Sequence, residues 1–193
     1  MTWMLTHSGI AFDLGRPKPS QVRIEDVAHH LSLINRFTGA TSRPYSVAEH
    51  SLLVTEILER DGGVRDPMCL RAALLHDAHE ALVGDVATPV KEFLGEGWHV
   101  LERGVQLAVH QHFGVERAMR EHRFTLKYAD LRALATERRD LMPPHEADWP
   151  ILKGFDPVSW IDLRDRDGMD WDDWKLAFLD KHAELSHRCE VMA

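Results

Sequence analysis

The segment 69–83 limits the possible folds most, because a His-Asp pair stands inside an almost wholly apolar run. Apolar flanks of several turns are typical of a helix that is buried on most of its sides. Burial of His76 and Asp77 is unfavourable unless another group pairs with them. At about 100° per residue, Glu80 lies one turn further on, between the directions of His76 and Asp77. One helix can therefore direct an imidazole and a carboxylate to one point, with a second carboxylate beside them.

Two interpretations of this segment are open. A converging histidine and carboxylate favour a metal site, in which Glu80 is the general acid or base. A buried ion pair between His76 and Asp77, with Glu80 in solvent, accounts for the same residues. On this segment alone the two interpretations are equally supported.

Helical periodicity recurs along the chain and predicts an all-α fold. We expect helices at 24–34, from 47, from 67 to about 83, and at 90–94, 98–113 and 121–141. Ser46 and Glu49 have the spacing of a capping box, and Asp66 before Pro67 is a typical helix start. The helix 121–141 is expected to bury Phe124, Leu126, Ala129, Leu131 and Leu134. Residues 3–14 predict either a small hairpin or an extended lead-in.

The tail from 145 differs in character, because it contains Trp149, Trp160, Trp171 and Trp174. Trp171, Trp174 and Phe178 recur at helical spacing, which favours packing in a core or an oligomer over a ligand platform. At 193 residues, without an internal repeat or a long linker, the chain is expected to form a single domain. Its core would span about 24–141, with a C-terminal helical extension at about 145–193.

The formal net charge of −8 argues against a nucleic-acid polymer as partner, because such binding needs a basic surface. The negative net charge does not exclude a small anionic substrate, because a local cluster of a metal and an arginine can attract an anion in spite of an acidic exterior. Two cysteines predict reduced thiols and a cytoplasmic protein. No apolar run approaches the length of a membrane span, and the first residues do not have the pattern of a signal peptide.

Polar residues stand in apolar surroundings on three of the expected helices: His50, the pair His76 and Asp77, and Asp130. Two imidazoles and two carboxylates suit a divalent ion such as Mn, Co, Fe or Zn. Such a metal polarises a phosphoryl oxygen and lowers the pKa of water, and Glu80 could manage the proton. The pattern therefore predicts a metal centre for hydrolysis.

The order H…HD…D resembles the signature of the HD-domain phosphohydrolases. Segments 35–37, 47–51, 76–85 and 87–91 are also similar to the sequence blocks of bacterial 5'-deoxynucleotidases and of phage deoxynucleoside triphosphate hydrolases. The resemblance runs in order through about 24–141 and does not extend into the tail. It implies a single helical HD domain.

The resemblance also implies roles for individual residues. It assigns one divalent metal per chain, Co, Mn, Zn or Fe, to His50, His76, Asp77 and Asp130, with further Mg or Mn carried by substrate phosphates. Glu80 takes the catalytic proton role, and Asp85 organises the nucleophile or substrate. Arg36 grips phosphate, and Lys91 is a second phosphate contact. Phe37 falls where the deoxynucleotidases have a tryptophan beside the sugar, which leaves selection of deoxyribose open.

Each position alone has a purely structural explanation. His50 could be an ordinary first-turn residue, Arg36 a partner of the helix dipole, Asp85 a turn residue and Lys91 a surface lysine. Asp130 could pair with Arg132 or Arg71. His79, His99, His110 and His112 are interpreted as ordinary, because His110 and His112 point to different sides of a helix. The order and spacing of the whole set favour the functional interpretation.

The expected activity is hydrolysis of the 5'-phosphate ester of (deoxy)nucleoside monophosphates by a cytoplasmic homo-oligomer, a dimer or higher. The alternative is release of triphosphate from deoxynucleoside triphosphates, because the same residues serve both reactions and only the space beyond the α-phosphate differs. A di-iron oxygenase is a more distant alternative, and it needs at least two more histidine ligands. A third alternative is a nucleotide sensor without catalytic activity. The presence of Glu80, a candidate catalytic residue, argues against it.

Overall fold

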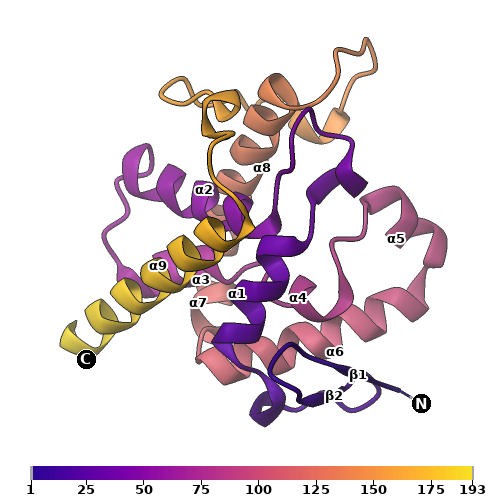
Figure 1. The fold of residues 1–193 in the computed structure, drawn as a ribbon. Coiled ribbons are helices and arrows are strands. Elements are labelled where there is room, and N and C mark those ends of the chain that lie inside the picture. The colour runs from indigo at the N-terminus through magenta and orange to yellow at the C-terminus, as the bar shows by residue number, and fades with distance from the viewer. Residues whose placement is uncertain (1, 193) are drawn as a thin grey trace.

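The structure, a computed structural model, describes residues 2–192 and is built mainly of helices (Figure 1). They are α1 (Ile24–Leu33), α2 (Val47–Arg60), α3 (Pro67–Leu74), α4 (Glu80–Val83), α5 (Thr88–Leu94), α6 (Glu96–Phe113), α7 (Glu116–Glu121), α8 (Arg123–Asp140) and α9 (Trp171–Met192). Strands β1 (Trp3–Leu5) and β2 (Ala11–Asp13) pair antiparallel, with Trp3 opposite Asp13. The all-α prediction is confirmed, and the lead-in is a hairpin.

The core is centred on α2, which packs against α1, α3, α8 and α9. Leu53, Val54 and Ile57 of α2 are buried. Ser46 caps this helix as expected, because its Oγ accepts a hydrogen bond from the Glu49 backbone N–H. The buried Glu49 carboxylate instead accepts hydrogen bonds from the half-buried Arg43 guanidinium, at 2.7 Å and 2.8 Å.

The helix predicted from 67 to 83 is interrupted, which corrects the geometry expected for its polar residues. α3 ends at Leu74, and turns carry the chain to α4 at Glu80. The His76 Nδ1–H donates to the Ala73 carbonyl at 2.8 Å. In a continuous helix, the Ala73 carbonyl would accept a hydrogen bond from the Asp77 N–H. Here it accepts one from the His76 side chain instead. His76, Asp77 and Glu80 therefore project from a turn and a new helix, not from one helical face.

The C-terminal helix α9 lies across α1, α2 and α3, as Figure 1 shows in yellow. Trp174, Phe178 and Leu185 are buried there, whereas Trp171 is 42% exposed. Most of the expected apolar stripe therefore packs against helices of the same chain.

Burial along α8 follows the expected pattern with one error. Leu126, Ala129 and Leu131 are buried and Leu134 is half-buried, but Phe124 is 73% exposed. The guanidinium of Arg123 lies 4.2 Å from the centre of the Phe124 ring, so this ring has a cation as its neighbour instead of the core. Within residues 2–192, no helix has the length and apolar character needed to cross a membrane.

Candidate metal centre

The four expected ligands converge from three parts of the chain. His50 comes from α2, His76 and Asp77 from the turn before α4, and Asp130 from α8. The His50 Nε2 atom lies 3.4 Å from Asp130 Oδ1 and 3.6 Å from Asp77 Oδ2, and His76 Nε2 lies 3.1 Å from Asp77 Oδ2. One ligand atom each from His50, His76 and Asp130 lies within 4.8 Å of the others. These separations suit donors around a single ion.

The hydrogen bonds of both imidazoles fit this interpretation. His50 Nδ1–H donates to Glu137 at 2.5 Å, and His76 Nδ1–H donates to the Ala73 carbonyl. The Nε2 atoms of both rings are buried and find no hydrogen-bond partner among residues 2–192. A hydrogen bond at one ring nitrogen fixes the tautomer and directs the other nitrogen toward a metal. The donor set therefore fits a divalent metal.

The electrostatics of the cluster favour positive charge at its centre. Burial and Arg36 oppose protonation of His50, but Glu137 and Asp130 outweigh them and raise its pKa to about 9. Burial raises the pKa of Asp77, yet His76, His50 and Arg36 hold it well below its ordinary value. The pKa of Asp130 is likewise lowered against burial, mainly by His50. Carboxylates that favour a positive charge on the His50 ring favour a metal cation in the place of that proton for the same reason.

Asp130 and Arg36 have other surroundings than the purely structural explanations predicted for them. Arg132 pairs with Asp61 at 2.5 Å, and the partners of Asp130 are His50 and Lys127. Arg36 lies at the start of the short 3₁₀ segment Arg36–Gly39 and is buried.

Arg36 is surrounded by carboxylates of the cluster. Its guanidinium lies 3.3 Å from Glu137, 3.8 Å from Asp77 and 3.9 Å from Asp85. A buried guanidinium beside candidate metal ligands is well placed to bind an anion that also reaches the metal.

Glu137 is a candidate site residue that the sequence did not predict. It is fully buried, and its carboxylate accepts hydrogen bonds from His50, from the Tyr45 hydroxyl at 2.9 Å and from Arg36. Burial raises its pKa, but Arg36 and His50 lower it below the ordinary value. The available signal was its position two turns after Asp130, on the same face of α8. Glu137 thus orients a candidate metal ligand and the arginine together.

Glu80 begins α4 and is buried beside the cluster. Burial, Asp77 and Asp85 raise its pKa well above the ordinary value, so its carboxyl favours the protonated form. Its Oε2 atom is buried without a hydrogen bond to any part of the chain that the structure describes. Burial also raises the pKa of Asp85, against the opposing effect of Arg36.

The two remaining predicted site residues lie at the edges of the cluster. The Lys91 ammonium donates to Glu102 of α6 at 2.5 Å and is half-buried, so it is not a free surface lysine. The Phe37 ring lies 5.3 Å from the Arg36 guanidinium and 6.1 Å from Trp149, whose position is in the tail.

Two of the histidines interpreted as ordinary lie inside the protein. His79 is buried with Nε2 3.7 Å from Glu102, and burial, His79 and His76 lower the pKa of His110 to about 4. The His112 ring instead packs edge-on against Phe113. Within residues 2–192, the group of His50, His76 and Asp130 is the one that brings three ligand atoms within 4.8 Å.

Comparison with known proteins agrees with this geometry. The model of a family described as HD domain matches residues 29–119, a range that contains Arg36, His50, His76 and Asp77 and ends before Asp130. An uncharacterized protein of Rhodobacter capsulatus is 45% identical over 161 residues, with 81% of this chain and 82% of that protein covered. The uncharacterized protein YfdR of Escherichia coli is 34% identical over 163 residues, with 84% of this chain and 85% of YfdR covered. This chain belongs to the HD-domain family, whose members bind divalent metals and are generally hydrolases.

Proposed function

We propose that the protein is a metal-dependent nucleotide phosphohydrolase that cleaves the 5'-phosphate ester of (deoxy)nucleoside monophosphates. The observation that carries this proposal is the position of Arg36, whose guanidinium lies 3.8 Å from Asp77 within the cluster of imidazoles and carboxylates. One cluster of side chains thus combines a candidate cation site with a guanidinium fork suited to phosphate. The cofactor is one divalent transition metal per chain, Co, Mn, Zn or Fe.

His50, His76, Asp77 and Asp130 would hold the ion. When bound, the metal supplies Lewis acidity toward a phosphoryl oxygen and a water of lowered pKa. Arg36 binds the remaining phosphate oxygens, and Glu137 keeps its guanidinium beside Asp77. Because Arg36 is buried, its attraction to the phosphate is less screened than it would be in solvent.

Glu80 carries the catalytic proton. Burial, Asp77 and Asp85 raise the pKa of its carboxyl, which favours its role as the acid that protonates the 5'-oxygen as the phosphorus–oxygen bond breaks. The products are then a nucleoside and inorganic phosphate, and the attacking water returns a proton to the enzyme. Asp85, 3.9 Å from Arg36, orients that arginine and the phosphate it binds.

Release of triphosphate from a deoxynucleoside triphosphate is the second candidate. Lys91 favours it, because this half-buried ammonium lies in the electrostatic field of Asp77 and Glu80. A cation there suits phosphates beyond the first one.

The test is product analysis with dAMP, AMP and dATP, each with Mn, Co and Mg, in which phosphate and triphosphate are measured separately. We expect free phosphate from dAMP. Triphosphate from dATP, without phosphate from dAMP, would replace the first candidate with the second. Absence of turnover of all three by metal-loaded protein would refute both.

A matched variant isolates the phosphate role. Arg36→Ala should raise KM for dAMP while the metal content stays unchanged. Arg43→Ala removes a half-buried arginine that pairs with the buried Glu49, and serves as the control for general destabilisation. An unchanged KM in Arg36→Ala would remove the phosphate assignment.

A further inference from the structure

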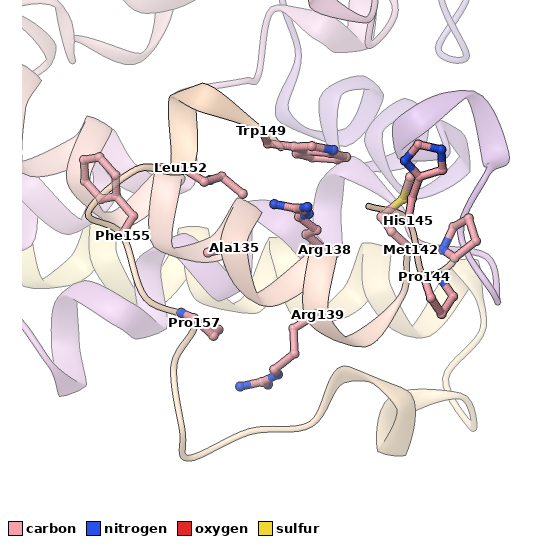
Figure 2. Close-up of a pocket in the computed structure, with 11 residues that line it drawn as sticks. Ala135, Arg138, Arg139, Met142, Pro144, His145, Trp149, Leu152, Phe155 and Pro157 are labelled. Carbon is pink, nitrogen blue, oxygen red and sulfur yellow. The ribbon is translucent and has the colours of Figure 1, made fainter. Parts of the chain in front are cut away.

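A cavity of about 730 Å³ lies between the C-terminal half of α8 and the tail segment 142–157 (Figure 2). Its walls include Arg138, Met142, Trp149, Leu152 and Phe155. Figure 2 shows the Trp149 ring lying over the Arg138 side chain, with Leu152 and Phe155 on one side and His145 on the other. The cavity is thus lined by apolar groups, an aromatic face and cationic side chains.

Trp149 connects this cavity to the candidate phosphate site. Its ring centre lies 6.1 Å from that of Phe37, with the two ring planes at 47°. The Phe37 ring lies in turn 5.3 Å from the guanidinium of Arg36. A continuous row of side chains therefore leads from the candidate phosphate-binding arginine through two aromatic rings into the cavity.

The backbone at this junction is held in an unfavourable conformation. Phe37 and Thr38 both have left-handed φ values, 54° and 55°. Residues with a Cβ, and β-branched threonine above all, rarely adopt this region. Such conformations persist where the surrounding structure enforces them, and they cluster at ligand sites. Here the conformation belongs to the two residues that follow Arg36, and the ring of the first, Phe37, lies beside Trp149.

Packing in the core does not explain why a tryptophan is present at position 149. Its ring is half-buried, while residues 143–148 before it are exposed, so it does not belong to the central core. One contact is the Arg138 guanidinium, 5.3 Å from the ring centre, and Arg138 also donates to the Ala147 carbonyl at 2.8 Å. These contacts fix the ring at the cavity wall.

We propose that Trp149 binds the base of the nucleotide by stacking, so that the tail supplies the nucleoside end of the substrate site. This inference rests on the proposed nucleotide hydrolase function. The phosphate lies at Arg36, the sugar passes Phe37, and the base reaches Trp149 at the cavity. Aromatic stacking accepts any base, because every base has a π face. Trp149 therefore contributes affinity for nucleosides in general.

The test compares a substrate that has a base with one that lacks it. Trp149→Ala should raise KM for dAMP by about tenfold or more, a loss in the range expected for one stacked base. KM for deoxyribose 5-phosphate should stay unchanged, because this substrate has no base. Trp149→Phe retains a ring and should recover most of the affinity for dAMP. Trp171→Ala is the matched control, since it removes a half-exposed tryptophan on α9.

A binding measurement makes the test independent of turnover. Binding of dAMP should quench tryptophan fluorescence in the wild type and in Trp171→Ala, and the quenching should be lost in Trp149→Phe. If Trp149→Ala raises KM equally for dAMP and for deoxyribose 5-phosphate, the role of Trp149 is structural. If neither KM changes, Trp149 does not contribute to substrate binding. Either result overturns the proposal. If the wild type hydrolyses neither substrate, the proposed function fails, whereas the fluorescence comparison still decides whether Trp149 contacts the base.

Discussion

The histidines of the candidate metal centre and a histidine beside the N-terminal hairpin differ in the hydrogen bonds that their ring nitrogens make. In the metal centre, His50 and His76 each donate from Nδ1 and leave Nε2 without a hydrogen bond within residues 2–192. Beside the hairpin, His30 uses both nitrogens: Nδ1–H donates to the Ala81 carbonyl at 2.7 Å, and Nε2 accepts from the His7 N–H at 3.1 Å.

The carboxylates beside the two groups differ in the same way. Asp26, near the hairpin, accepts hydrogen bonds from the Ser8 N–H and hydroxyl, both at 2.7 Å. Asp77 instead directs Oδ2 to His50 and His76. The number of histidines, 13 in this chain, does not locate a metal centre. Ring nitrogens without hydrogen bonds that converge with carboxylates distinguish the candidate metal centre from the other histidines.

The largest expected effect separates the two groups directly. His50→Ala should lose bound metal and fall to background activity, because a central donor is removed and Asp77 and Asp130 lose their partner. His30→Ala should retain metal and activity, since its nitrogens bind backbone groups. Metal content by mass spectrometry and phosphate release measure both variants. Equal metal content in His50→Ala and His30→Ala would contradict the proposed difference between the two histidines.

Within the metal centre, Glu80→Gln separates proton transfer from metal binding. We expect a loss of about 10²–10⁴-fold in kcat with the metal content unchanged, because Gln keeps the shape and cannot donate an acidic proton. Asp77→Ala should lose both metal and turnover. Full activity in Glu80→Gln would contradict the proton role, and loss of its metal would make Glu80 a ligand.

A smaller effect is expected from the carboxylate behind His50. Glu137→Gln should weaken metal affinity by about 10–100-fold, the usual consequence of removing a group that orients a ligand. Glu49→Gln is the control, because Glu49 is an equally buried glutamate that binds Arg43 instead of a histidine. Competition with a chelator measures both affinities. If the two variants bind metal equally well, Glu137 is only a structural group.

The smallest effect concerns a histidine far from the metal, His182 of α9. Burial and Arg71 lower its pKa to about 4, from an ordinary value of 6.5. Between these values the unfolded chain binds the proton and the folded chain does not, so stability falls as the pH decreases from about 6.5 to 4. The slope is a fraction of the roughly 1.4 kcal/mol per pH unit of one fully coupled proton, because the ring is partly exposed.

Urea unfolding at several pH values measures this effect, and His182→Gln provides the comparison. The free energy of unfolding of the variant should depend less on pH than that of the wild type in this window. Identical pH profiles would show that His182 does not titrate differently in the two states.

The sequence predicted what depends on local pattern. Apolar periodicity placed the helices, and the order of His50, His76, Asp77 and Asp130 predicted four residues that do converge. The break after Leu74 was missed because it depends on one hydrogen bond from the His76 side chain to the Ala73 carbonyl. Periodicity does not report a competition between a side chain and the backbone.

The missed partners are all distant in sequence. The spacing of Glu137 from Asp130 places it on the same face of α8, but its partners His50 and Arg36 are set by the packing of α8 against α2. The contact of Trp149 with Phe37 likewise depends on the path of residues 142–157, which carry no periodic signal. Such contacts follow from tertiary packing and not from local propensity.

The central claim is that His50, His76, Asp77 and Asp130 hold one metal ion. Anomalous diffraction from crystals grown with zinc tests it most directly. We predict one strong peak at roughly 2.0–2.2 Å from both Nε2 atoms and from an oxygen of each aspartate. A zinc peak at His79 and His110 instead, or no peak between the four residues at saturating zinc, would contradict the account.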